Sequence, residues 1–442
     1  MNTPDNNPTL AQLLARYRSK QTSARKRVLM ISELNSLPFL EQKFLHHPVY
    51  EVINAGIETI IHVGVANYIE AIVAEFKNNP NFFDGITGFF DTPNAVAVAI
   101  SHLVGKPGPS LDSVVRSQNK MRSRTLQQES IAEYSVAAVS AEQVLAEGNI
   151  PFQPMFVKPM RAAGSFGCEI VHDTAALQAR IDKDRHFLEQ HNAPYIEAIQ
   201  TATDDPAILE MLADSNDYFC EEMIQGEQFA VNGYVYNGQI QLHGIVAEIY
   251  LPGAKSFLRH EHPTELPPEW LTRIDDLTQR FISHTGLDNT EFDLEFCIDF
   301  ELNRLALIEI NPRAVAQYEN LYMMASGDDM MTTICALACG DPPPALQTPK
   351  YQFCYSCELR SFDDQHVLAI PDEENLAAIK ADFPDAIVVN RIPPGVRKLS
   401  DAKKSIDTYR YCMISIPGDS REAIMTTLEA IKEKLNYRFQ PV

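Results

Sequence analysis

The sequence predicts a protein of mixed α/β and α+β class, in which a parallel α/β unit is followed by strands that pair in antiparallel hairpins. Three observations lead to this class. Strand-like and helix-like segments alternate from Lys26 to Leu103, which is typical of a parallel sheet. Clusters of proline and glycine at 105–109 and 340–344 divide the chain. Between them, consecutive strand patterns and one hairpin pattern indicate antiparallel pairing.

The first unit is predicted from short apolar runs that alternate with helical spacing. We expect strands at Val28–Ile31, Ile57–Val63 and Ile86–Phe90, and helices at Tyr68–Phe76 and Ala95–Leu103. The last of these helices would be capped by Asp91 or Thr92. Helical spacing over 10–17 predicts a leading helix before the first strand.

The rest of the chain carries helices and paired strands. Helices are expected at Asn119–Gln128, Thr174–Gln190, Pro267–Thr285, Met324–Gly340 and Arg421–Leu435. Strands are expected within Pro151–Ile170, where a glycine-containing loop joins two of them, within Phe219–Gln241, and as a hairpin at Phe292–Arg313. The stretch that contains His260 and His262 is expected to be a polar loop rather than a metal site.

Composition and charge exclude several classes of protein. The 442 residues are 45% hydrophobic and 22% charged, which excludes a disordered or fibrous chain. The net charge of −22 repels phosphate backbones, so we expect no nucleic-acid partner. No apolar run is long enough to cross a membrane and no signal peptide is recognisable, so we expect no membrane partner. Eight cysteines in such a chain favour reduced thiols and a cytoplasmic location.

The strongest candidate for chemistry is the predicted hairpin. Alternation along its second strand places Glu309, Asn311 and Arg313 on one face. A hairpin centred on Leu302 sets Glu295 directly opposite Glu309. Two like charges across a ladder are destabilising unless a cation lies between them, and carboxylate and amide oxygens are ligands that Mg²⁺ takes beside substrate phosphates. The alternative is that these side chains form only the solvated polar face of a hairpin.

A second candidate is the loop that follows Lys158, the last polar residue of an apolar strand. The loop contains Gly164-Ser165-Phe166-Gly167 and returns into another strand, whereas a Walker A loop opens a helix. Such a loop can close over phosphates and offer backbone N–H groups, with Lys158 as a point charge. An ordinary glycine-containing turn is the alternative.

A third segment places the acidic pair Glu221-Glu222 at a strand end, before an apolar run. Alone, this pattern is more typical of a surface strand. In their order and spacing, however, the three segments resemble the ATP-grasp superfamily, in the branch that includes biotin carboxylase and carboxylate–amine ligases. The motif Ile308-Glu309-Ile310-Asn311-Pro312-Arg313 carries the resemblance most strongly.

The resemblance implies an organisation for nearly the whole chain. It implies a leading helix or linker at 1–25, a pre-ATP-grasp parallel α/β domain at 26–117, an ATP-grasp domain at 118–342 with its flap lobe at about 130–220, and an α+β capping region at 343–442. ATP would lie between the two lobes of the ATP-grasp fold, held between antiparallel sheets.

The resemblance also implies a role for each motif residue. Lys120 and Lys158 would contact phosphates, with Arg124 one helical turn after Lys120 on the same face. Gly164, Ser165, Phe166 and Gly167 would form a mobile flap. In the hinge, which begins at Glu221, backbone groups of Glu222 and Ile224 would contact the adenine edge. Glu295, Glu309 and Asn311 would hold Mg²⁺ or Mn²⁺, and Arg313 would face the transferred phosphoryl group or the substrate carboxylate.

Two positions depart from the family pattern. Gln228 stands where the family often has a glutamate that binds the ribose hydroxyls, although a glutamine can still bond a hydroxyl. Biotin carboxylases continue after their arginine with Gln-Val-Glu-His, whereas Arg313 is followed by Ala314-Val315-Ala316-Gln317. Bicarbonate and biotin chemistry is therefore not expected.

These features lead us to expect an ATP-dependent carboxylate–amine ligase that forms an amide through an acyl phosphate and releases ADP and phosphate. Its partners would be a small carboxylate and an amine, with an amino acid among them, and related enzymes are often homodimers. The alternatives are a phosphotransferase that makes a stable phosphorylated product, and a non-catalytic nucleotide-binding protein. The loop Arg391–Arg397 carries two basic groups that are candidates for contact with a substrate anion.

Overall fold

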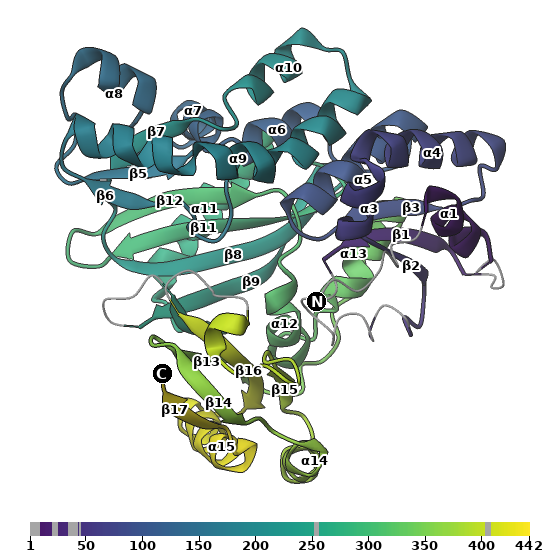
Figure 1. Ribbon diagram of the computed structural model, residues 1–442, viewed down its shortest axis with the longest axis vertical. Coiled ribbons are helices and arrows are strands. Elements are labelled where there is room, and N and C mark those ends of the chain that lie inside the picture. Colours follow the sequence, from purple (N-terminus) through teal and green to yellow (C-terminus); the bar gives the residue numbers. More distant parts are fainter. Residues whose placement is uncertain (1–8, 20–24, 34–42, 44–45, 252–255, 403–407) are drawn as a thin grey trace.

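The structure is a computed structural model that describes residues 9–19, 25–33, 43, 46–251, 256–402 and 408–442. It confirms the predicted combination of a parallel sheet with antiparallel sheets. In Figure 1 the parallel unit lies at the right, two antiparallel sheets lie one above the other at the left, and the C-terminal strands lie at the bottom.

The N-terminal unit is built on three parallel strands in the order β2-β1-β3. Strand β1 (Arg27–Ser32) is fully buried between β2 (Glu51–Gly56) and β3 (Gly85–Gly88). Helix α5 (Asp91–Val104) packs on β1 and β3, α4 (Val65–Asn78) packs on α5, and α1 (Leu10–Ser19) is the predicted leading helix. Both glycines of β3 are needed because a Cβ would lie 2.4 Å from the carbonyl oxygen of Ala338 at Gly85 and of Pro93 at Gly88.

The strand predicted at Ile57–Val63 is wrong, because these residues form helix α3 (Ile57–Val63). The strand of the sheet is β2, which ends immediately before this helix. Ile57 and Ile60 are both buried on one face of α3. A strand would place two residues with this spacing on opposite faces, so the burial of both on one face fits a helix.

A four-stranded antiparallel sheet in the order β4-β7-β5-β6 forms the upper lobe in Figure 1. Its strands are β4 (Ala138–Ser140), β5 (Met155–Pro159), β6 (Glu169–Val171) and β7 (Tyr218–Glu222). The helices in this part of the chain are α6 (Leu111–Gln118), α7 (Lys120–Ser130), α8 (Ala141–Glu147), α9 (Thr174–Ala202) and α10 (Pro206–Ala213). Helix α9 continues past its predicted end at Gln190 because Tyr195, Ala198 and Ile199 are buried in the core.

The large sheet has eight strands in the order β12-β11-β8-β9-β10-β13-β16-β15. They are β8 (Glu227–Tyr236), β9 (Gln239–Tyr250), β10 (Phe257–His262), β11 (Thr290–Asp299), β12 (Arg304–Asn311), β13 (Phe353–Ser361), β15 (Ile387–Asn390) and β16 (Tyr409–Gly418). The remaining elements are α11 (Pro268–Thr285), α12 (Glu319–Ala325), α13 (Met330–Cys339), α14 (Glu373–Asp382), α15 (Arg421–Leu435) and the pair β14 (Gln365–Ala369) and β17 (Arg438–Pro441). The sheet continues across the proline cluster at 342–344, since β13 pairs with β10.

Two further predictions in this region are corrected. The helix predicted at Met324–Gly340 is divided into α12 and α13, because Gly327 between them has φ of 68° and the Gln347 carbonyl occupies its Cβ position. The predicted polar loop around His260 and His262 is strand β10, and both histidines are buried.

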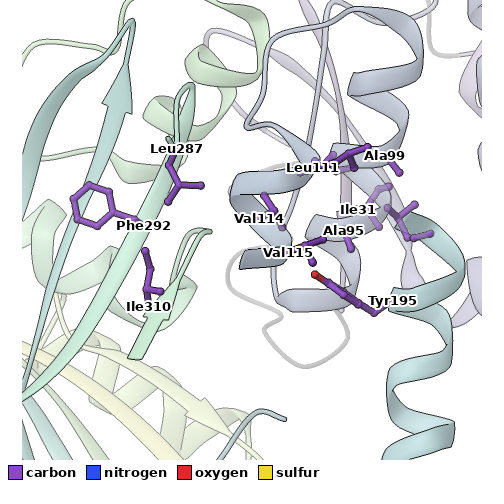
Figure 2. Packing of buried hydrophobic residues seen from close by; sticks show 14 of the residues in the cluster. Ile31, Ala95, Ala99, Leu111, Val114, Val115, Tyr195, Leu287, Phe292 and Ile310 are labelled. Carbon is purple, nitrogen blue, oxygen red and sulfur yellow. The ribbon is translucent and has the colours of Figure 1, made fainter. Parts of the chain in front are cut away.

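One hydrophobic cluster joins the N-terminal unit to the large sheet. Figure 2 shows Ala95 and Ala99 of α5 and Val114 of α6 on one side of this cluster, and Phe292 and Ile310 of β11 and β12 on the other. Because interiors are close-packed, this shared core fixes the start of α5 relative to the end of β12.

Among the described residues, no single helix is both long and apolar enough to cross a membrane. Helices α3 and α4 reach that length and composition only as a pair, and the chain bends by 100° between them.

Candidate active site

A cleft of about 1460 Å³ lies between the four-stranded sheet and the large sheet. Arg391, Arg410 and Met413 line it from the C-terminal region. The predicted site residues that line it are Lys120, Lys158, Gly164, Ser165, Phe166, Glu221, Ile224, Gln228, Glu295, Glu309, Asn311 and Arg313. Segments that are far apart in the sequence therefore meet at one cavity.

The predicted pairing of Glu295 with Glu309 is confirmed, because these residues are partners in the antiparallel ladder of β11 and β12. The register shifts between Glu295 and Phe296, so the pairing centred on Leu302 holds only in the half of the hairpin that carries the carboxylates. This irregularity is a β-bulge, a feature that often redirects side chains next to active sites.

The charges of this carboxylate pair oppose each other. Burial, followed by the nearby charges of Glu309, Glu248 and Asp293, raises the pKa of Glu295 well above its ordinary value. The Lys120 Nζ lies 3.2 Å from Glu309 Oε2 and offsets part of this negative charge. A divalent cation between the carboxylates would remove the repulsion, so the donor set fits Mg²⁺ or Mn²⁺.

The side chain of Asn311 is less available as a metal ligand than predicted. Its Oδ1 accepts a hydrogen bond from Arg313 at 3.1 Å, and its Nδ2 donates to Asp293 at 2.9 Å. Within the described residues, no group of three or more His, Cys, Asp or Glu side chains is arranged to hold a metal ion. A cation at Glu295 and Glu309 would therefore need further oxygen ligands from a bound phosphate or from water.

The two predicted phosphate lysines reach the cleft from different elements. Lys120 is the first residue of α7, which is capped by the Asn119 side chain, and its Nζ donates to the Ala162 carbonyl at 2.9 Å. Lys158 lies on β5, where it is 7% exposed, and its Nζ lies 2.7 Å from Glu221 Oε1. Each lysine is therefore held in place by a protein oxygen before any ligand binds.

Arg124 does not reach the cleft, which corrects the expectation that it lies beside Lys120 on the phosphate face. It is buried, its Nη2 lies 2.7 Å from Glu221 Oε2, and its Nη1 donates to the Leu307 carbonyl at 2.7 Å. Burial raises the pKa of Glu221, but Arg124 and Lys158 outweigh burial and lower that pKa overall. Glu221 therefore positions Lys158, and its carboxylate is not available to a nucleotide.

Arg313, which follows β12, links this strand to the N-terminal unit. Its Nε donates to Asp91 Oδ1 at 2.7 Å. Asp91 is already the first residue of α5, so the expectation that its side chain caps this helix is wrong. Burial raises the pKa of Asp91, but Arg313 and Arg161 outweigh it and bring that pKa to about 2. Asp91 is thus a charged partner that orients Arg313.

The predicted flap is the loop between β5 and β6. Gly164, Ser165 and Gly167 have positive φ values of 63°, 54° and 71°. A side chain at Gly167 would collide with Pro159 and with the Tyr218 hydroxyl, both 2.7 Å from its Cβ position. Phe166 stacks on Phe187 of α9 with ring centroids 4.1 Å apart, so the loop is supported from outside the cleft.

Only some residues of the predicted hinge face the cleft. Ile224 and Gln228 line the cleft, and the Gln228 Nε2 donates to Glu295 Oε2 at 3.2 Å. The Glu222 side chain instead pairs with Arg304, and its backbone N–H donates to the Ala137 carbonyl at 3.1 Å. Only the carbonyl of Glu222 can therefore serve an adenine edge.

Three carboxylates of the site were missed from the sequence: Asp91, Asp293 and Glu248. Asp293 shares the alternating face of β11 with Glu295, so the period of two contained a usable signal. Burial raises its pKa to about 6, although Arg313 acts against this shift. Glu248 lies on β9 with no motif around it, and Asp91 follows no pattern that links it to Arg313.

Replacing Glu248 by glutamine is expected to change how stability depends on pH. Burial raises the pKa of Glu248 to about 7, against an ordinary value near 4.3. The folded state then holds a proton that the unfolded state releases, so Glu248 makes the free energy of unfolding fall as pH rises from about 4.3 to about 7. Glu248→Gln should remove this fall. At pH 8 its free energy of unfolding should exceed that of wild type by on the order of 1–3 kcal/mol.

Urea unfolding at pH 5, 6, 7 and 8, without nucleotide or metal, measures this difference. Glu227→Gln is the matched control, because Glu227 lines the same cleft but is exposed. A gap between Glu248→Gln and wild type that stays constant with pH would contradict the expectation.

The comparisons with known proteins agree with this geometry. Residues 151–320 match the family model of the ATP-grasp domain. No match was found among curated proteins. An L-amino acid ligase from Bacillus licheniformis has 15% sequence identity and a TM-score of 0.69, covering 95% of this chain and 100% of its own.

Two further solved structures have the same fold. Phosphoribosylglycinamide synthetase from Anaerococcus prevotii has 12% identity and a TM-score of 0.63, covering 94% of this chain and 100% of its own. Biotin carboxylase from Campylobacter jejuni has 14% identity and a TM-score of 0.61, covering 98% of this chain and 90% of its own. Residues 151–320 therefore correspond to an ATP-grasp domain, and the chain shares its overall fold with these three solved structures.

Proposed function

We propose that this chain is an ATP-dependent carboxylate–amine ligase. The observation that carries the proposal is the convergence of two lysines, two facing carboxylates and one arginine on a single cleft: Lys120, Lys158, Glu295, Glu309 and Arg313. The ATP-grasp domain and the likeness to an L-amino acid ligase support it. A protein that only binds a nucleotide has no need of two facing carboxylates, which repel each other in the absence of a cation.

In this proposal ATP binds along the cleft. Lys120 and Lys158 contact its phosphates, while the backbone of Ile224 and the amide of Gln228 contact the base and the ribose. Glu295, Glu309 and the side-chain oxygen of Asn311 would hold Mg²⁺ or Mn²⁺. The bound cation would offset negative charge on the phosphates.

The reaction joins an acid to an amine in two displacements. A carboxylate oxygen of the acid attacks the γ-phosphorus, the bond to the β-phosphate oxygen breaks, and ADP leaves. The amine nitrogen then attacks the acyl carbon, phosphate leaves with the electron pair of the C–O bond, and the nitrogen loses a proton. Lys120, Lys158 and Arg313 offset the charge that develops on the transferred group, and most of the acceleration comes from positioning and electrostatics.

Water competes with the amine for the acyl phosphate. The loop of Gly164, Ser165 and Phe166 lines the cleft beside Lys158, which is the place from which a covering segment would exclude water. Its two glycine hinges, Gly164 and Gly167, allow the backbone to change conformation at low cost.

The test is ADP release from purified protein with Mg-ATP, against amino acids and small carboxylic acids given singly and in pairs. Release that requires both an acid and an amine, with an amide as product, would support the ligase. Release with one compound and a stable phosphorylated product would replace this proposal with a phosphotransferase. Tight ATP binding without release for any pair would favour a nucleotide-binding protein.

Removing Arg313 should separate nucleotide binding from turnover. Arg313→Ala is expected to leave the Kd for ATP within about threefold of wild type, while amide formation falls by about 10²- to 10³-fold, because the lost cation acts on the reacting groups. Calorimetry with ATP and an assay of amide product measure the two effects.

Two further variants serve as controls for this result. Arg313→Lys keeps a charge beside Asp91 and separates loss of catalysis from loss of folding. Arg304→Ala, on the same strand and paired with Glu222, should leave both quantities unchanged. If Arg313→Ala raised the Kd for ATP as much as it slowed amide formation, the role given to Arg313 would be wrong.

A further inference from the structure

Glu248 lines the cleft, yet the proposed reaction gives it no role. It lies on β9 and is 7% exposed. In the antiparallel ladders, Val246 of β9 pairs with Ala230 of β8, which pairs with Glu295 of β11. Glu248 stands two residues farther along β9, so its backbone is about 12 Å from that of Glu295, at about 4.8 Å per strand and about 3.4 Å per residue. Because both side chains line the same cleft, a substrate of a few carbon atoms can span the gap between the two carboxylates.

The carboxylate of Glu248 has neutral neighbours. The Tyr318 hydroxyl donates to its Oε1 at 2.7 Å, and the Tyr250 hydroxyl donates to its Oε2 at 3.4 Å. The His260 Nε2 lies 3.9 Å from Oε1, but burial, followed by two nearby arginines, lowers the pKa of His260 to about 3, so this ring is uncharged. Among the ion pairs of the described residues, Glu248 has no lysine or arginine partner. Its charge therefore has no compensating cation there.

A polar atom beside this carboxylate also lacks a partner. His260 is 1% exposed, and its Nε2 accepts or donates no hydrogen bond within the part of the chain that the structure describes. The same nitrogen is the one that lies 3.9 Å from Glu248 Oε1. A buried carboxylate without a cation and a buried nitrogen without a partner both cost stability. Stability therefore does not explain a glutamate at position 248, and costs of this kind are typical of functional sites.

The surroundings of Glu248 suit a nitrogen cation better than a metal ion. Tyr250, Phe257 and Tyr318 line the cleft, and Phe257 is the ladder partner of Tyr250. No group of three or more His, Cys, Asp or Glu side chains among the described residues is arranged to hold a metal ion. An ammonium group donates charged hydrogen bonds to a carboxylate and is attracted by aromatic rings. A single carboxylate beside aromatic side chains therefore has the chemistry that recognises an ammonium group.

We propose that Glu248 binds an ammonium group of one of the two substrates of the ligation. The carboxylate accepts hydrogen bonds from the ammonium group, and the Tyr318 hydroxyl holds the carboxylate in place. This inference rests on the proposed function and narrows its substrates. The ammonium group belongs either to an amino acid that is activated at its carboxylate, or to the amine substrate in the protonated form in which it binds.

Replacing Glu248 by glutamine should weaken one substrate and spare the nucleotide. At pH 8, where Glu248 is ionised, Glu248→Gln should raise the KM of the ammonium-bearing substrate by about 10- to 100-fold, as expected for a lost charged hydrogen bond. The KM of ATP should stay within about twofold of wild type. Glu265→Gln is the matched control, since Glu265 follows β10 but is exposed and outside the cleft lining. An equal rise in the KM of ATP would show a general distortion of the cleft and overturn the proposal.

Matched substrates identify which partner carries the ammonium group. If it is the acid, wild type should prefer an amino acid to the same acid without its amino group, and Glu248→Gln should not. If it is the amine, Glu248→Gln should weaken the reaction of an alkylamine, which is charged at pH 8. The reaction of hydroxylamine, which is uncharged at that pH and converts an acyl phosphate to a hydroxamate, should be spared. Equal effects on the charged and uncharged members of both pairs would overturn the proposal.

A binding experiment separates this inference from the proposed function. n-Butylammonium and n-butanol are each titrated at pH 8 into protein saturated with Mg²⁺ and a non-hydrolysable ATP analogue, and binding is followed by NMR of the small molecule. Wild type and Glu265→Gln should bind the ammonium at least tenfold more tightly than the alcohol, and Glu248→Gln should bind the two alike. The same preference in all three proteins, or no preference in wild type, would overturn the site whether or not the chain is a ligase. The expected preference without ligation of any pair would leave the site standing and remove the proposed function alone.

Discussion

Glu309→Gln is expected to lower turnover by about 10³-fold, which corresponds to about 4 kcal/mol of lost transition-state stabilisation. The substitution removes one of the two facing carboxylates and the ion pair that holds Lys120 at 3.2 Å. It therefore weakens the hold on the metal and on a phosphate lysine together. ADP release under saturating substrates measures the loss, and a titration with Mg²⁺ should show a raised metal requirement.

The same variant should not unfold the protein. Without Glu309, one of the charges that raise the pKa of Glu295 is gone, so the metal-free protein is expected to be at least as stable as wild type. Glu301→Gln is the control, because Glu301 is exposed at the turn of the same hairpin. Near-normal activity of Glu309→Gln would contradict the metal assignment, and loss of folding would show that the pair serves stability instead.

Glu221→Gln is expected to lower the free energy of unfolding by about 3–5 kcal/mol, the usual cost of removing one partner from a buried ion pair. Glu221 is 1% exposed, and its two oxygens face Lys158 at 2.7 Å and Arg124 at 2.7 Å. Loss of its charge leaves two buried cations without compensation. Because the pKa of Glu221 is lowered in the folded state, its contribution is present at neutral pH and disappears in acid.

Urea unfolding at pH 7 measures this loss, and the neighbouring carboxylate provides the comparison. Glu222 pairs with Arg304 where both side chains are about one third exposed, so Glu222→Gln should cost at most about 1 kcal/mol. Equal losses for the two variants would show that the buried network around Glu221 is not the stabilising feature inferred from its contacts.

Local patterns predicted the hairpin that pairs Glu295 with Glu309, because both residues lie within one supersecondary unit. The pairing of Glu295 with Glu309 follows from a period of two and one turn, so two strands of sequence contain all the information required. The bulge beside Glu295 could not be predicted from the sequence, because moving the pairing by one residue does not change the apolar composition of either strand. Lys120 was found only through resemblance, whereas Lys158 was already a candidate because of the loop that follows it, and both lysines line the cleft.

Contacts between distant segments explain what the sequence did not reveal. Asp91 reaches Arg313 only because a shared core places the start of α5 beside the end of β12. Arg124 looked like a phosphate ligand by helical spacing, but it turns inward because Glu221 and the Leu307 carbonyl satisfy it there. The strand predicted at Ile57–Val63 failed for a simpler reason, because an apolar run of this length fits a short buried helix as well as a strand.

The order of strands in the large sheet also determines when a newly synthesised chain can complete its fold and its cleft. Its strands β8 to β12 have been synthesised once residue 311 has emerged, yet β10 has no partner on its outer side until β13 arrives. Arg410, which lines the cleft, is added only with β16 near the end of the chain. Until then the nascent protein carries an open strand edge, the kind of surface that promotes association between chains. Cutting the gene after the proline cluster at 342–344 would therefore give an aggregation-prone fragment rather than a smaller enzyme with a simpler pocket.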